Sequence, residues 1–168
     1  MRAALCAQLA TLALLNVPAE AAENLEKLKT KLARQQDPAD RAKTTVKIGT
    51  ILVDQSARAF AEHRYESGKA ALEDYLGYVR RAYQDLQASG RNARKKPKGF
   101  KDLEIHLRKA ALRLEDVARS VPYDERAPIE AAREEIETIW ESLMRALFGL
   151  KPRPPSASPP EGTQEKIR

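Results

Sequence analysis

Cysteine, histidine and tryptophan are scarce in this sequence of 168 residues, which has one, two and one of them respectively. The single cysteine, Cys6, has no second cysteine with which to form an internal disulfide. It lies within the N-terminal segment that we expect to be removed as a signal peptide, so the mature chain is expected to have no thiol and no cysteine-ligated metal. A domain without disulfides must be stabilised by its hydrophobic core. A chain of this length is long enough to build one.

The sequence also lacks the familiar catalytic motifs. It has no Gly-x-Ser-x-Gly elbow, no phosphate-binding glycine loop and no His-Glu-x-x-His pair, and it lacks the Glu-x-x-His that di-metal helical bundles use. His63 is expected in the last turn of a helix. Asp102 and His106 are four residues apart and would share a metal ion only with a third ligand, which the sequence does not identify, so we interpret them as a helix-surface pair. We therefore expect no catalytic, cofactor or metal site; a metal-dependent or hydrolytic enzyme using His106 is the least favoured alternative.

The only long uncharged apolar stretch is at the N-terminus. Arg2 precedes thirteen uncharged residues, 3–15, which are too few to span a bilayer. Small residues follow at positions that suit cleavage after Ala19 or Ala21. The sequence therefore predicts a signal peptide over 1–21 and an exported protein, periplasmic or secreted, with no transmembrane helix after cleavage. Cys6 lies too early in the stretch to be a lipoprotein cysteine.

Between residues 22 and 150 the apolar residues recur every three or four positions, which is typical of α-helices. We expect a short first helix around Leu25–Leu32 and four long ones, at about 38–63, 66–89, 100–121 and 129–149. Asp37 and Pro38 have the character of a helix start, and Gly90 and Gly149 of helix ends. No segment alternates polar and apolar residues over strand length. The prediction is an all-α domain, an antiparallel up-and-down bundle of four long helices plus a short N-terminal helix.

Two segments near the C-terminus differ from the rest in composition. Residues 140–150 are apolar nearly all round; we expect the first helix to bury them, and the alternative is a surface that faces a partner or lipid. Residues 151–168 hold five of the ten prolines and few apolar residues. This composition favours a disordered, proline-rich tail.

The turn "FAEHRYESGKAALEDYL", Phe60 to Leu76, resembles the turn between the two helices of a tetratricopeptide repeat. That resemblance implies a helical hairpin here, although no second copy follows 34 residues on. Taken whole, the chain resembles exported helical-bundle proteins of bacteria, and this resemblance implies no particular activity.

The positive charge of the chain is concentrated in "RNARKKPKGFK", residues 91–101. This segment holds six of the 30 basic residues, and the remaining 24 equal the number of acidic residues. The candidate anion-binding residues are Arg91, Arg94, Lys95, Lys96, Lys98 and Lys101. Lys151 and Arg153 are expected at the same end of the bundle, which would give the molecule a cationic tip.

Four interpretations of this segment remain open: a solvated loop without a ligand, a site for an anionic envelope surface, a site for an acidic protein partner, and a nucleic-acid site. Nucleic acid is the least favoured, because Phe100 is the only aromatic residue in the segment and the chain is expected to be exported. We therefore predict a non-enzymatic protein that acts by binding or scaffolding in the periplasm or cell envelope. The alternative is an electrostatic binder of anionic lipid or cell-wall polymer through residues 91–101.

Overall fold

The computed structural model describes residues 19–150, and within this range every regular element is a helix. The predicted all-α fold is confirmed for this part of the chain. The predicted proline-rich tail and nearly all of the predicted signal peptide lie outside the described residues. The elements are α1 (Ala19–Arg34), α2 (Pro38–Ala61), α3 (Tyr65–Ala88), α4 (Phe100–Ser120), the 3₁₀ turn η1 (Tyr123–Glu125) and α5 (Ala127–Phe148).

The helix ends are set by the residues that the sequence marks for this role. Asp37 caps α2, since its Oδ1 accepts hydrogen bonds from the backbone N–H groups of Ala39 and Asp40 at 2.9 and 3.0 Å, and Pro38 occupies the first helical position. Gly149 ends α5 in the left-handed conformation, with φ at 69°. These local signals explain why the bounds lie close to those predicted.

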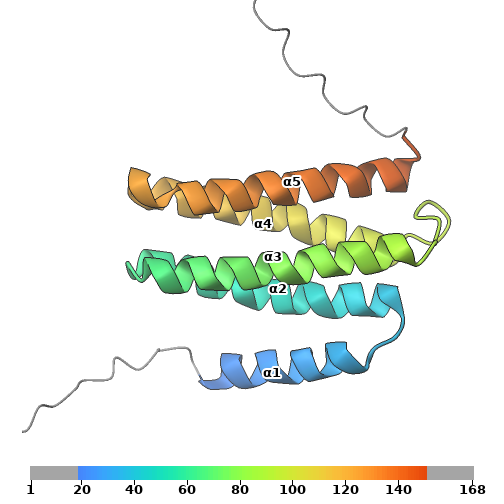
Figure 1. Cartoon of the computed structure of the whole chain (residues 1–168), viewed down its shortest axis with the longest axis horizontal. Coiled ribbons are helices and arrows are strands. Elements are labelled where there is room, and N and C mark those ends of the chain that lie inside the picture. The colour runs from blue at the N-terminus through green and yellow to red at the C-terminus, as the bar shows by residue number, and fades with distance from the viewer. Residues whose placement is uncertain (1–18, 151–168) are drawn as a thin grey trace, which may run out of the picture.

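Helices α2 and α3 form one hairpin, helices α4 and α5 form a second, and the two hairpins pack against each other. Each helix runs in the opposite direction to the one before it (Figure 1). Helix α2 packs against α3 and α4, while α5 packs against α4 and α3. The loop of residues 90–99 therefore connects the two hairpins: it joins α3, which packs mainly against α2, to α4, which packs mainly against α5. It lies at the same end of the molecule as the α1–α2 connection and the end of α5 (Figure 1).

One hydrophobic core runs between the four long helices. The apolar stripe predicted for α4 is buried throughout: Phe100, Leu103, Leu107, Ala110, Leu114, Val117 and Val121 are all in the core. Arg80 on α3 holds Glu135 on α5 through two hydrogen bonds of 2.5 and 2.7 Å, so a bidentate ion pair supplements the apolar contacts. None of the described helices is long and apolar enough to cross a membrane.

The position of α1 differs from the prediction. It packs on α2, where Leu25 and Leu32 are buried, and lies on the opposite side of the molecule from α5 (Figure 1). The short connection between the two helices folds α1 back onto α2, where Arg41 donates hydrogen bonds to the carbonyls of Leu32 and Gln35. The expectation that α1 buries the end of α5 is therefore wrong. Phe148 and Leu150 remain 63% and 59% exposed.

Candidate functional site

The basic segment forms a folded loop that is anchored at both ends. The side chain of Asn92 accepts hydrogen bonds from the backbone N–H groups of Arg94 and Lys95, at 3.0 and 3.1 Å, and so closes a tight turn. Ala93 is buried, and Gly99 has a φ of 84°. A Cβ at Gly99 would lie 2.8 Å from the Cα of Ala39, so only glycine lets the loop approach α2 this closely.

Two of the six candidate anion-binding residues are already paired with acids at the start of α2. Arg91 forms an ion pair with Asp37, and the Nζ of Lys98 lies 2.8 Å from the Oδ1 of Asp40. The hydrogen bond from Arg91, with those from the backbone of α2, lowers the pKa of Asp37 to about 2. The same contacts raise the pKa values of Arg91 and Lys98. These two cations fasten the loop to the helix rather than offering charge to a ligand.

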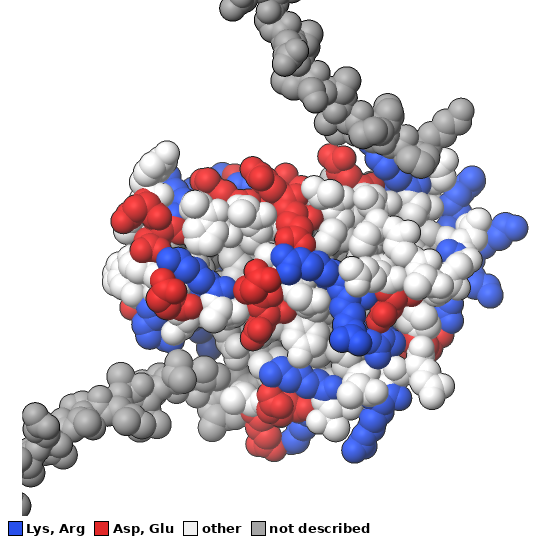
Figure 2. All heavy atoms as spheres, viewed as in Figure 1, with Lys and Arg blue, Asp and Glu red and all other residues white. Residues whose placement is uncertain are grey.

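The other four candidates, Arg94, Lys95, Lys96 and Lys101, are exposed, and none of them pairs with an acid within residues 19–150. We call these four residues the cationic cluster. Figure 2 shows Lys and Arg side chains gathered at this end of the molecule. Lys151 and Arg153, predicted to add to the charge here, lie outside the described residues.

Arg94 of the cationic cluster lies against the exposed apolar end of α5. A Cβ at Gly149 would be 2.9 Å from the Cδ of Arg94, so the Arg94 side chain covers the residue that separates Phe148 from Leu150. Both apolar side chains are mostly exposed. The sequence contains both halves of this site, but they are some 50 residues apart and no local pattern predicts that they meet.

A hollow of about 400 Å³ lies behind the loop, between the ends of α3 and α5. Its polar lining includes Arg91, Asn92, Arg94 and Gln87, and the Gln87 side chain is hydrogen-bonded to the hydroxyl of Tyr83. The hollow places the side-chain amides of Gln87 and Asn92, which can donate hydrogen bonds to an anion, close to Arg94 of the cationic cluster. Gly149, at the end of α5, also lines this hollow.

The two histidines do not form a site with neighbouring acids. His63 follows α2 with a φ of 57°, and its Nδ1 lies 2.8 Å from the hydroxyl of Tyr65. His106 is 8% exposed and packs edge-on against Tyr75, with ring centroids 5.7 Å apart. The expected helix-surface pair with Asp102 is therefore wrong, because Asp102 instead accepts a hydrogen bond from the backbone N–H of Gly99. No group of three or more potential metal-binding side chains occurs within the described residues.

Comparison of the chain with protein-family models, curated proteins and solved structures found no match. The geometry of the site itself is the basis for the function proposed below.

Proposed function

We propose that this protein is a non-enzymatic binding protein of the cell envelope that attaches to anionic lipid surfaces through its cationic cluster. The observation that carries the proposal is the contact between Arg94 and Gly149, which joins the segment that bears the cationic cluster to the end of α5 where Phe148 and Leu150 are exposed. Cations next to exposed apolar side chains are the combination that peripheral membrane proteins use. Export by the N-terminal segment 1–21 is part of the proposal.

The magnitudes show why both halves of the site are needed. A lysine or arginine close to an anionic leaflet contributes about 1 kcal/mol, so the four cations contribute about 4 kcal/mol, which corresponds to an affinity of roughly 1 mM. Full burial of a phenylalanine or leucine side chain contributes about 1.5 to 3 kcal/mol. Partial insertion of Phe148 and Leu150 would bring the affinity into the micromolar range.

The same arrangement favours lipid over the other anions considered. Phe100, the one aromatic residue of the basic segment 91–101, is 4% exposed and packs in the core, so it offers no surface on which a base can stack. A water-soluble anionic polymer of the cell wall would neutralise the cations but leave Phe148 and Leu150 exposed to water. An acidic protein partner remains the alternative for a scaffolding role.

In this proposal the helices are the scaffold that positions the site. The hairpins α2–α3 and α4–α5 form an antiparallel four-helix bundle, and the loop is held to it by Arg91, Lys98 and Gly99. Leu150, the last residue that the structure describes, lies at this end of the bundle. The role that we propose for residues 151–168, predicted to be a proline-rich tail, is that of a tether.

The test is co-sedimentation with vesicles, using protein purified after expression of the full chain in an exporting host. Changing Arg94, Lys95, Lys96 and Lys101 to Gln should abolish binding to anionic vesicles. Changing the exposed cations Lys47, Arg58, Arg81 and Arg113 to Gln is the matched control, since it removes the same charge away from the loop. Equal loss of binding in both variants would overturn the proposed site. The mass of the purified protein will show whether residues 1–21 have been removed.

A further inference from the structure

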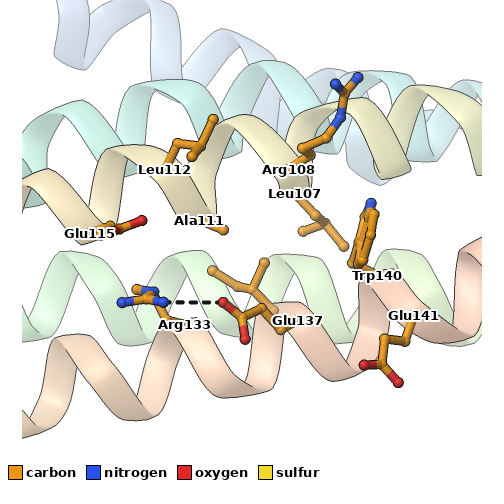
Figure 3. A pocket seen from close by; sticks show the side chains of 10 residues that line it. Leu107, Arg108, Ala111, Leu112, Glu115, Arg133, Glu137, Trp140 and Glu141 are labelled. Carbon is orange, nitrogen blue, oxygen red and sulfur yellow. Dashed lines mark hydrogen bonds and ion pairs between the residues drawn. The ribbon is translucent and has the colours of Figure 1, made fainter.

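A second hollow of about 400 Å³ lies between α4 and α5, away from the loop, and has an apolar floor with a charged rim (Figure 3). Leu107, Ala111 and Ile136 contribute to the floor, and Trp140 lines one end of it. Leu112 projects from the α4 side and is 62% exposed although it lies in the middle of a helix. A large apolar side chain exposed next to an apolar groove is typical of a surface that another molecule covers.

The charges at the four corners of the rim alternate in sign, both along and across the groove. At one end of the groove Glu115 on α4 lies across from Arg133 on α5, and at the other end Arg108 on α4 lies across from Glu141 on α5 (Figure 3). The two corners on each helix are therefore one acid and one base, in opposite order. Glu137, which lies between the two corners on α5, is paired with Arg133. A two-fold rotation about an axis in the plane of the groove places unlike charges on each other at every one of the four positions.

We propose that the α4–α5 groove is the contact surface between two copies of this chain. If the copies pack with their α4 helices parallel, Glu115 faces Arg133 of the second copy and Arg108 faces its Glu141. If they pack antiparallel, Glu115 faces Arg108 of the second copy and Arg133 faces its Glu141, while Glu137, midway between them, faces the same residue of the second copy. Either arrangement covers Leu112 and the groove-lining part of Trp140, and each is an isologous contact that closes at two copies.

A second copy fits this groove better than a partner of a single sign of charge. Acids and bases on the rim nearly balance, so the groove offers no net charge that would attract a strongly acidic or basic protein. Some rim charges have partners on their own helix: Glu115 contacts Arg119, and the Nη2 of Arg133 lies 3.3 Å from the Oε1 of Glu137. Because these exposed pairs contribute little to folding, reversing a charge should change association rather than the fold.

This contact is separate from the lipid site and goes beyond it. No residue of the cationic cluster lines the groove. A dimer would bring two cationic clusters into one particle, and with parallel helices both would face the same surface. Association is measured without lipid, so its failure would not affect the proposed lipid site, and failure of lipid binding would not affect this inference.

Sedimentation equilibrium of the purified full-chain product, without lipid and over micromolar to submillimolar concentrations, tests the contact. We expect a reversible change from one chain, 18.8 kDa if unprocessed, to two. Leu112→Asp should abolish the change. Glu115→Arg should weaken association by about tenfold or more, because it replaces two attractions with two repulsions. Arg58→Glu, on the exposed surface of α2, is the control and should have no effect.

Two double variants distinguish the arrangements. Adding Arg133→Glu to Glu115→Arg restores association if the helices are parallel, whereas adding Arg108→Glu restores it if they are antiparallel. Circular dichroism of each variant verifies that it is folded. A mass of one chain at all concentrations overturns the proposal, as does association that survives Leu112→Asp or that neither double variant restores.

Discussion

His106 makes the stability of this protein sensitive to pH. The imidazole lies in the core, against Tyr75 and next to Gly49, and its Nε2 has no hydrogen-bond partner within the described residues. Burial disfavours the charged form, and the nearby charge of Lys109 acts in the same direction. Together they lower the pKa of His106 from 6.5 to about 4.

The direction and size of the effect follow from proton linkage. Below pH 6.5 the unfolded chain binds a proton at His106 that the folded chain does not, so the free energy of unfolding falls as the pH falls. The loss continues until the folded protein also titrates, near pH 4, and reaches about 3 kcal/mol there. Above about pH 7 this histidine contributes no pH dependence. A loss of about 3 kcal/mol is a large fraction of the 5 to 15 kcal/mol that stabilises an ordinary domain.

Urea unfolding followed by circular dichroism, at intervals from pH 7.5 to 4, measures the loss. The His106→Leu variant is the comparison, because it shares every carboxylate with the original protein but lacks the titrating ring. The original protein should lose about 3 kcal/mol more than the variant. Equal losses in the two proteins would refute the reasoning. So would a proton NMR titration in which the His106 ring becomes charged near pH 6.5.

Three further substitutions test the packing around the core histidine and the loop. Gly49→Ala places a Cβ 2.6 Å from the Nε2 of His106 and should lower the free energy of unfolding by about 1 to 3 kcal/mol; chemical denaturation measures this, and a change below 0.5 kcal/mol would contradict the contact. Tyr75→Phe removes a buried hydroxyl that has no hydrogen-bond partner among residues 19–150, so the melting temperature should stay the same or rise; a fall of several degrees would contradict this. Gly99→Ala puts a side chain at a residue whose φ is 84° and against Ala39, so it should lower the free energy of unfolding by about 2 kcal/mol and weaken lipid binding. Unchanged thermal unfolding would contradict this prediction.

Features that depend on neighbouring residues in the chain could be predicted from the sequence. The cap at Asp37, the end of α5 at Gly149 and the buried stripe of α4 follow from local chemistry and helical periodicity. Each of these signals lies within one element. They fix where the helices begin and end and which face of each is buried.

Features that depend on how two helices meet could not be predicted. His106 looks like a surface residue beside the α4 stripe, and it is buried only because Gly49 on α2 leaves room for the ring. In the same way, nothing in the sequence places Arg94 against Gly149, so the exposed apolar end of α5 and the basic loop appear as unrelated segments. An unexplained glycine within the apolar stripe of a long helix is the signal that indicates such a close approach.

The loop itself illustrates how tertiary contacts change a charge-based interpretation. The sequence does not distinguish the six cations from one another. In the structure, however, Arg91 forms an ion pair with Asp37, and Lys98 forms one with Asp40. Of the six cations in segment 91–101, four are therefore available to a ligand. This reduces the expected electrostatic contribution from about 6 to about 4 kcal/mol and makes the apolar contacts decisive.

Partitioning of the purified protein between buffer and vesicles tests the central claim most directly. Neutral vesicles are compared with vesicles that contain an anionic phospholipid, each at low and at physiological salt, and the Phe148→Ser, Leu150→Ser double variant is measured beside the original protein. The account predicts binding to the anionic vesicles alone, weakening as salt screens the charges and reduced at least tenfold in the double variant, at about 1.4 kcal/mol per tenfold change. Binding that is absent, or the same for neutral and anionic vesicles, would contradict it.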